Sequence, residues 1–382
     1  MKSKVSSFLS LTLILLLAGC STLPQNNFKG QLFINPRFES AQPFSEGLAA
    51  VQINKKWGYI NSTDKFQINP KYSEAGLFRA GKALVATYPK NFTNPYKKVK
   101  DKYIFVGQYF LIDRKGNVVK EFAKGQEFYA NYSSNLSDPL TLSMRLPNGN
   151  CIYLSDRGLV LSKTEFTFCD PFNEGLAGAG DLKSGLAGFI DRKGDWAIDP
   201  IFESVDSFSE GLAPADMYVP NGMPASRYGY IDRKGKWEIN PQYWLTLPFS
   251  EGFGEVINEG SESDSYGLHG FVDKSGKMVI PQDFPTKHSS KYVDDGNFSS
   301  GYTVVESDSG VAFMDRKLQI LNRWFDSVGQ FNEGYAPVEV NGKWGFIDTK
   351  GEYVVQPQFD DVGAVWEGYA AVKIGNLWGY LK

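Results

Sequence analysis

Hydrophobic and polar positions alternate along most of the chain in short runs separated by turn residues, and residues 331–363 show this pattern most completely. Residues 335–340 alternate and are followed by Asn-Gly at 341–342, the dipeptide most typical of a two-residue hairpin turn. A turn of this length pairs Val338 with Gly345. Both faces of the resulting hairpin are largely apolar, so we expect both faces to be covered.

The same stretch predicts a third strand after this hairpin. A turn over 348–351, in which Asp bonds local backbone and Gly takes a positive φ, leads into an extended segment over 353–356. Pro357 is expected to end that strand at a sheet edge, because proline cannot donate to a ladder. Gly345 lies in mid-strand and has no side chain, which suggests close approach by a neighbour. The unit is therefore predicted to be a three-stranded meander.

Copies of this unit recur through residues 31–382 with a period of about 34 residues. The shared pattern is Phe-Ser/Asn-Glu-Gly, then Trp-Gly-aromatic-Ile-Asp, then Gly, then Pro. About nine units are expected, and copies two, three and seven are degenerate because Phe110, Ile152 and Ala312 replace the glycine of the Trp-Gly pair.

This ensemble resembles the WG-repeat (WG beta-repeat) family, named for the Trp-Gly pairs at 57–58, 344–345 and 378–379. The resemblance covers nearly all of residues 31–382. It implies a repeat fold of largely uncharacterised function, and it supplies no catalytic residues.

The two ends of the repeat array bear on its closure. Residues 31–38 match only the third strand of a unit, and the last copy stops after its second strand. The first segment could therefore complete the last sheet, whereas an open array would leave an apolar edge exposed. We predict an all-β fold of tandem three-stranded meander repeats in a closed propeller-like ring. A β-solenoid is the alternative, since about nine units is many for a propeller.

The N-terminus has the features of an export signal. Lys2 and Lys4 precede a short apolar run, and Leu-Ala-Gly-Cys at 17–20 resembles the lipobox of a bacterial lipoprotein. The resemblance implies that residues 1–19 are a lipoprotein signal peptide and that Cys20 is lipidated, with residues 20–30 as a polar tether. It also implies a lipid anchor in the bacterial cell envelope, at the outer membrane if the organism is Gram-negative.

Charge and repetition limit the possible chemistry. With 40 basic and 43 acidic residues the chain is mildly acidic, so no nucleic-acid partner is expected. Carboxylates at equivalent positions in several units are more typical of turns than of catalysis or calcium binding. These are Glu46, Glu174, Glu210, Glu251, Glu333 and Glu367, and also Asp113, Asp191, Asp232, Asp273 and Asp348.

Histidine and cysteine are both scarce. His269 occupies the Trp position of its unit and is expected to pack there, while His288 lies in an irregular segment. Two histidines cannot supply a three-His zinc site, so we expect no metal and no cofactor. Cys151 and Cys169 would form a disulfide in an oxidising compartment, although two buried free thiols are the alternative.

Copies two, five and six are longer than the period, and their extra residues all fall between the first and second strands. Equivalent turns of a repeat array emerge on the same side, so these insertions could build one binding face, although they could also be tolerated surface loops. The candidate binding face comprises Tyr88, Lys97, Lys98, Tyr103, Tyr218, Arg227, Glu259 and Tyr266.

Taken together, these features predict a lipid-anchored, non-enzymatic binding or scaffold module of the cell envelope, with a protein or glycan partner. No acid/base or metal constellation stands out in the sequence, which favours this interpretation over an enzyme. The alternative is a hydrolase or modifying enzyme of envelope polymers, with its site in the irregular copies two and three.

Overall fold

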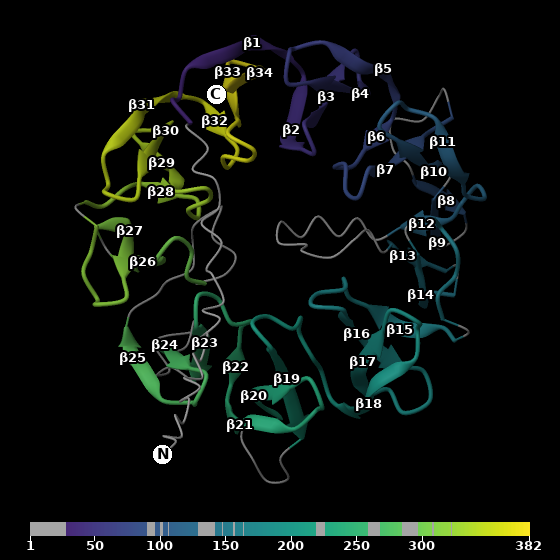
Figure 1. Cartoon of the computed structure of the whole chain (residues 1–382), viewed down its shortest axis with the longest axis vertical. Coiled ribbons are helices and arrows are strands. Elements are labelled where there is room, and N and C mark those ends of the chain that lie inside the picture. Colours follow the sequence, from purple (N-terminus) through teal and green to yellow (C-terminus); the bar gives the residue numbers. More distant parts are fainter. Residues whose placement is uncertain are drawn as a thin grey trace, which may run out of the picture.

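The structure is a computed structural model of the whole chain. It describes residues 28–89, 96–99, 102–105, 107–128, 142–146, 148–155, 157–162, 164–218, 226–258, 268–284, 297–307, 309–321 and 323–382. Every regular element in these residues is a β-strand, and none of them forms a helix able to cross a membrane. The strands are arranged as a closed ring of small antiparallel sheets (Figure 1). The predicted all-β, propeller-like ring is therefore confirmed, and the open solenoid is not formed.

The described strands make nine sheets, from which nine repeat units follow. One sheet, β8–β9, is a hairpin inserted into unit two, and the seven-stranded sheet comprises units three and four. Units one and two contain β2 (Ser40–Ser45), β3 (Leu48–Ile53), β4 (Lys56–Asn61), β5 (Phe66–Tyr72), β6 (Glu74–Ala75), β7 (Lys82–Thr87), β8 (Tyr96–Val99), β9 (Lys102–Phe105), β10 (Gln108–Asp113) and β11 (Val118–Glu121).

Units three to five contain β12 (Glu127–Phe128), β13 (Leu142–Arg145), β14 (Cys151–Leu154), β15 (Phe166–Cys169), β16 (Leu176–Asp181), β17 (Ala187–Asp191), β18 (Trp196–Phe202), β19 (Leu212–Tyr218), β20 (Ser226–Asp232) and β21 (Trp237–Tyr243). Units six and seven contain β22 (Leu245–Thr246), β23 (Phe253–Asn258), β24 (Leu268–Asp273), β25 (Met278–Phe284), β26 (Tyr302–Ser307) and β27 (Gly310–Asp315). Units eight and nine contain β28 (Ser327–Val328), β29 (Tyr335–Val340), β30 (Lys343–Asp348), β31 (Tyr353–Phe359), β32 (Asp361–Val362), β33 (Ala370–Ile374), β34 (Leu377–Leu381) and β1 (Leu32–Phe38).

Unit eight shows how the alternating sequence becomes a sheet covered on both sides. The two-residue turn sets the register of β29 and β30, and Val338 pairs with Gly345 as predicted. Ala336, Val338 and Phe346 are fully buried even though they come from opposite faces of the hairpin. Each unit is packed between its two neighbours in the ring, which explains why neither face is polar.

The sequence-based description of the unit was wrong in two respects. The segment between units was expected to be only a linker, but it contributes a short extra strand. In unit eight β28 pairs with β29, so the full unit has four strands instead of three. The last strand was also expected to end at Pro357, but β31 continues to Phe359.

The continuation past Pro357 is possible because the strand is irregular at that point. The pairing of β30 with β31 shifts register on both sides of Phe346, and a Cβ on Gly345 would lie 2.4 Å from the carbonyl oxygen of Val355 and 2.7 Å from the nitrogen of Pro357. A proline is tolerated in an outer strand at such a bulge. The predicted close approach to Gly345 is thus confirmed, and it gives the glycine of the Trp-Gly pair a steric reason.

The ring closes by sharing a strand between the two ends of the chain. β1 pairs antiparallel with β34, Leu32 with Leu381 and Phe38 with Trp378, and so forms the outer strand of unit nine (Figure 1). The tether is shorter than expected, because Phe28 is buried. Its ring lies 5.2 Å from that of Tyr335 in unit eight.

The core lies mainly between units. The phenylalanine that opens each complete motif is buried and meets an aromatic ring of the preceding unit edge to face, an arrangement that favours aromatic pairs. Examples are Tyr59 with Phe78 at 4.8 Å, Tyr230 with Phe249 at 4.7 Å, and Tyr380 with Phe44 at 5.1 Å across the seam of the ring.

Candidate functional site

The meander places its connections on two opposite faces of the ring. Successive strands run antiparallel, so the turns after the first and third strands of a unit share one face, and the turn after the second strand shares the other with the connector to the next unit. We call the first the turn face, which carries the Glu-Gly and Asp-x-Lys-Gly turns. We call the second the insertion face, because the long insertions of units two, five and six emerge there.

On the turn face the repeated glutamates join neighbouring units. Each has a positive φ, and its carboxylate accepts hydrogen bonds from the backbone of the next unit. Glu333 accepts from the amides of Glu367 and Gly368 at 2.8 and 2.9 Å, and Glu367 accepts in the same way from Glu46 and Gly47 across the seam at 2.5 and 2.8 Å. Further bonds of this kind run from the amides of Gly81, Gly211, Gly252 and Gly301 to Glu46, Glu174, Glu210 and Glu251. The role expected for these residues, in turns and not in chemistry, agrees with these bonds.

The turn aspartates are used locally. Asp348 Oδ1 accepts from the amides of Lys350 and Glu352 at 2.9 and 3.0 Å, and the same pattern recurs in the other turns. The hydrogen bond from Asn117, followed by other contacts, holds the pKa of Asp113 below its usual range. No group of three or more potential metal ligands occurs among the described residues.

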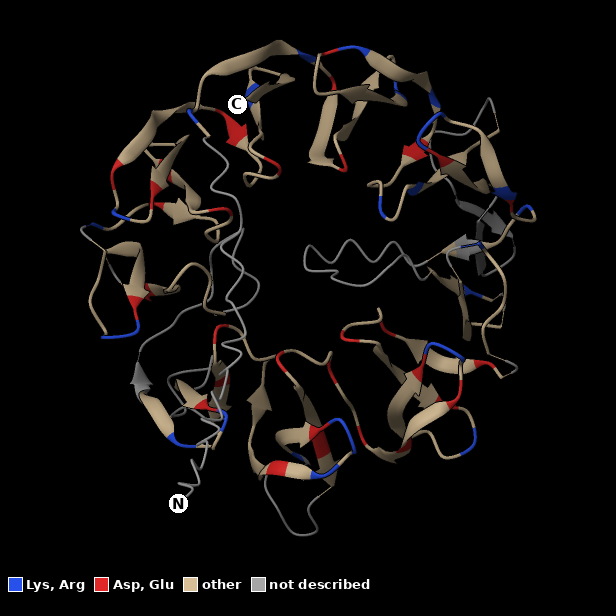
Figure 2. Ribbon diagram, in the orientation of Figure 1, with Lys and Arg blue, Asp and Glu red and all other residues tan. Residues whose placement is uncertain are grey.

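Basic side chains of the same turns reach back to the preceding glutamates. Arg316 lies 2.9 Å from Glu251, and Lys274 lies 3.1 Å from Glu210. Figure 2 shows acidic segments at the inner tips of several units and basic segments toward the outer rim. The turn face is therefore a network of ion pairs and backbone hydrogen bonds between units.

The residues predicted for a binding face are distributed unequally. Tyr88 is half-buried beyond β7, and its amide donates to Ser73 Oγ at 3.0 Å. Lys98 in β8 pairs with Tyr103 in β9, and Lys97 precedes Lys98 in the same hairpin. Tyr218 ends β19 with 58% of its surface exposed, close to the half-buried Arg227 at the start of β20. Glu259, Tyr266 and Cys20 lie outside the described residues.

Exposed apolar side chains that the sequence reasoning missed accompany Tyr218 on the insertion face. Trp244 and Leu245 are each 39% exposed, and Met217 and Leu268 are similarly exposed. These residues end or begin strands of units five and six, where β20 contacts β22 and Leu268 pairs with Asn258. We call Met217, Tyr218, Trp244, Leu245 and Leu268 the apolar patch.

A signal for this patch was present in the repeats. Trp244 is the first residue of its connector, where other units have Glu39, Ser73, Asp326 and Asp360. Those polar side chains accept hydrogen bonds from the neighbouring turn or connector; for example, Glu39 accepts from the amides of Asn54 and Lys55. A tryptophan in this place cannot do so. A unit-by-unit comparison of the connectors would have singled it out.

Two acidic groups lie close to each other at the junction of units four and five. Burial, followed by the charge of Asp206, raises the pKa of Asp170 to about 7. A Cβ on Gly178 would lie 2.6 Å from a carboxylate oxygen of Asp170, so the absence of a side chain at Gly178 makes room for this carboxyl group. A raised carboxyl pKa of this kind is typical of acid/base groups, but it also occurs in purely structural sites.

The described histidine, His269, is buried as predicted. It is not surrounded by apolar groups alone, however, because its Nδ1 lies 2.6 Å from Glu255 Oε1. Both side chains are at most 3% exposed, so this pair is inside the fold and away from solvent. His288 lies outside the described residues.

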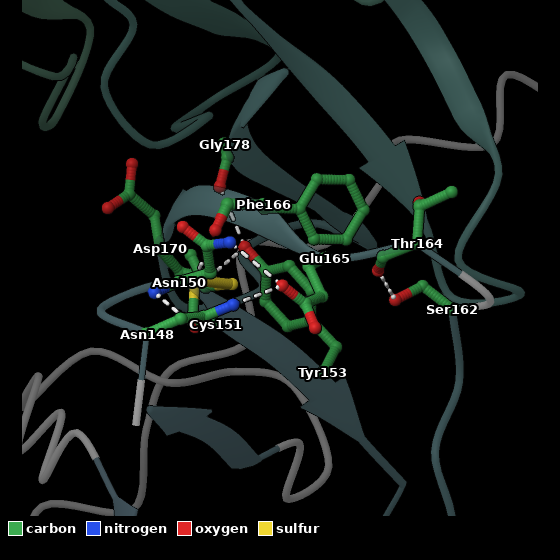
Figure 3. The surroundings of a disulfide bond; sticks show 11 residues. Asn148, Asn150, Cys151, Tyr153, Ser162, Thr164, Glu165, Phe166, Asp170 and Gly178 are labelled. Atoms are coloured by element: carbon green, nitrogen blue, oxygen red, sulfur yellow. Dashed lines mark hydrogen bonds between the residues drawn. A yellow bond between two sulfur atoms is a disulfide. The ribbon is translucent and has the colours of Figure 1, made fainter. Parts of the chain in front are cut away.

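Cys151 and Cys169 form a disulfide between β14 and β15, which joins unit three to unit four (Figure 3). Around it the Tyr153 hydroxyl donates to the carbonyl oxygens of Asp170 and Gly178, at 2.9 and 2.7 Å. Glu165 accepts from the side-chain amides of two asparagines, Asn148 and Asn150. The bridge thus lies within a polar network at the junction of these units.

Comparison with solved structures supports the fold. The crystal structure of the eukaryotic initiation factor matches with a TM-score of 0.52 and 9% identity, over 85% of this chain and 88% of that chain. The structure of the Dos1 propeller matches with a TM-score of 0.38 and 12% identity, over 85% and 95% of the two chains. Apo AztD from Citrobacter koseri matches with a TM-score of 0.35 and 15% identity, over 69% and 85%.

Among curated proteins, none matches this chain. The family model described as "WG containing repeat" matches six stretches, at residues 26–57, 57–87, 188–217, 228–260, 325–344 and 344–378. The matched segments include the Trp-Gly pairs at 57–58, 344–345 and 378, and also the units in which Gly188 and Gly229 follow other residues. This all-β ring is therefore built, over these six stretches, from WG repeats.

Proposed function

We propose that this protein is a lipid-anchored, non-enzymatic binding or scaffold module of the bacterial cell envelope. Its insertion face would engage a protein or glycan partner. The observation that carries the proposal is the difference between the two faces. The turn face uses its polar groups to join units, whereas the insertion face combines the long insertions with the apolar patch.

The chemistry of the patch suits recognition. Exposed aromatic residues next to arginine are enriched where proteins bind partners. Tyr218 and Trp244 offer such rings, and Arg227 pairs with Met217 between β19 and β20. Solvent-exposed side chains of this size contribute nothing to the core, so their placement on one face favours an interaction there.

Anchoring at Cys20 and an envelope location rest on the lipobox-like sequence. The disulfide between Cys151 and Cys169 supports an oxidising compartment, because disulfides persist there and are rare in the cytosol. An outer-membrane location in a Gram-negative organism is part of the same proposal.

Shortening the insertions tests the binding face directly. Replacing residues 89–106, 219–225 and 259–267 with Asn-Gly turns should leave the ring folded, because lengthening or shortening a surface loop changes stability little. We expect this variant to lose a partner that the parent protein retains from a detergent extract of envelopes. A folded variant that retains the partner would place the binding face elsewhere.

A second set of variants separates the patch from the insertions. Tyr218→Ser with Trp244→Ser should weaken retention of the partner by about tenfold or more, as for hot-spot aromatic residues. Ile201→Ser is the matched control, since Ile201 is 60% exposed on the outer strand β18 and away from the insertions. Equal effects of the two sets would contradict the proposal.

The pair Asp170 and Asp206 favours one alternative function, a hydrolase of envelope polymers. In this alternative Asp170, with a pKa of about 7, would act as the general acid. The test is release of soluble fragments from isolated envelope polymers by the parent protein and by Asp170→Asn. Release that the substitution abolishes would favour the enzyme, and the absence of release by the parent protein would exclude it for those polymers.

A further inference from the structure

The N-terminal chain joins the ring on one particular face. Phe28 packs against Tyr335, which directly follows the Glu-Gly turn of unit eight. A Cβ on Gly30 would clash with Val355, at the start of β31 just after the Asp-x-Lys-Gly turn. β1 then runs from Leu32, beside Leu381, toward the insertion face. The chain therefore enters the ring from the turn face.

The distance from this entry point to Cys20 is short. Eight peptide units separate Cys20 from Phe28, and a fully extended chain spans at most about 3.6 Å per residue, or about 29 Å in all. If Cys20 carries acyl chains in a bilayer, as proposed above, Phe28 cannot lie farther than this from the membrane surface.

The turn face also displays exposed positive charge around the ring. The third residue of the Asp-x-Lys-Gly turns is an exposed lysine in five units, while the turn aspartates are half-buried and bonded to their own backbone amides. We call Lys115, Lys193, Lys234, Lys317 and Lys350 the lysine belt. The connectors on the opposite face present acids instead, including Glu39, Asp326 and Asp360.

We propose that the turn face lies against the membrane, with the lysine belt on anionic phospholipid headgroups, and that the insertion face points away from the bilayer toward the partner. This inference rests on the proposed lipid anchor. The short reach from Cys20 brings the turn face to the surface. The belt then favours a flat orientation, because each lysine near an anionic surface is attracted to it and the lysines are spread over five units. A tilted ring would bring only some of them close.

The experiment uses the lipidated protein in vesicles of phosphatidylethanolamine with roughly 30% phosphatidylglycerol, a composition that supplies anionic headgroups. A single added cysteine carries a fluorophore, either Ser275→Cys on the turn face of unit six or Asn376→Cys on the insertion face of unit nine. Spin-labelled lipid headgroups quench a fluorophore close to the surface. Asn376 is in the unit that contains the anchored strand, so mere proximity to the anchor would favour quenching at Asn376.

We expect quenching at position 275 to exceed that at position 376 by about threefold or more, with the difference shrinking in neutral vesicles and at high salt. Changing Lys115, Lys193, Lys234 and Lys317 to Gln should shrink it as well. The matched control changes Lys55, Lys56, Lys71 and Lys343 to Gln, which removes the same charge from the insertion face and rim and should leave the difference intact.

Two failures can be told apart. A mature protein whose mass shows no acyl chains on Cys20 overturns the anchor, and with it the basis of this inference. An acylated protein with equal quenching at both positions, or with stronger quenching at 376, overturns the orientation and leaves the anchor standing.

Discussion

Units eight and three solve the same packing problem by different means. Unit eight has four strands, a glycine under the bulge of its outer strand, and a glutamate, Glu333, that is bonded to the next unit. Unit three has the described strands β12–β14, with Ile152 in place of that glycine and a disulfide to unit four. Its ladder to β15 is a single residue pair, Cys151 with Phe166.

This difference shows what the repeat pattern is for. The conserved-looking positions of unit eight provide contacts between strands and between units, and each is a small steric or hydrogen-bonding requirement. Where a unit has lost the pattern, a covalent link at Cys151–Cys169 joins it to its neighbour instead. We expect substitutions at equivalent positions in the two units to have very different costs.

The largest expected effect is that of Gly345→Val in unit eight. The new Cβ would lie 2.4 Å from the carbonyl oxygen of Val355, which belongs to the backbone and cannot move aside without disrupting β31. We expect a loss of about 4 kcal/mol in the free energy of unfolding. Ile152→Gly, the reverse change at the equivalent place in unit three, should cost about half as much. Urea denaturation of both variants measures the comparison, and equal losses would contradict it.

The disulfide should rank next. Replacing Cys151 and Cys169 with Ser opens a loop of 18 residues and should cost about 3 kcal/mol in the chain-entropy account. Because contacts in a repeat array are local, hydrogen exchange should quicken in β14 and β15 and stay unchanged in β29 and β30. Faster exchange in unit eight would mean that the bridge stabilises the whole ring and not its own junction.

Much of the fold could be predicted from unit eight because its signals are local. Asn341-Gly342 fixes a hairpin register, Gly345 marks a close approach, and the incomplete copies at the two ends indicate a shared strand. Each of these follows from the geometry of a few adjacent residues.

The missed features depend on tertiary context. β28 is two residues long, which is too short to show any hydrophobic period. Pro357 remains within β31 because a bulge opposite Gly345 accommodates it. The proximity of Asp170 to Asp206 arises from the packing of separate units. Trp244 could have been recognised, since it replaces a polar residue of the connector.

A moderate effect is expected at the seam, where unit nine meets unit one. Glu367→Gln replaces the charged acceptor of the amides of Glu46 and Gly47, and should cost about 1–2 kcal/mol. Glu333→Gln removes the same type of contact between units eight and nine, which the chain also joins covalently. Only the seam variant should speed hydrogen exchange in β1. Equal exchange in the two variants would show that strand pairing alone holds the ring closed.

The smallest expected effect is at Asp170, at the junction that the hydroxyl of Tyr153 in unit three also contacts. Its pKa is raised from 3.8 to about 7, so the folded protein holds a proton there that the unfolded chain has already lost. Stability should therefore fall as pH rises from about 4 to about 7 and remain lower above that range. Asp170→Asn removes this penalty. We expect it to stabilise the protein at pH 8 by on the order of 1 kcal/mol after allowing for solvent screening, and to change little at pH 4.5. Asp113→Asn provides the opposite sign, because hydrogen bonds lower the pKa of Asp113 and its contribution is present at neutral pH and lost in acid. Urea midpoints of both variants at the two pH values test this, and a destabilised Asp170→Asn at pH 8 would mean that its charged form is bound favourably in the ring.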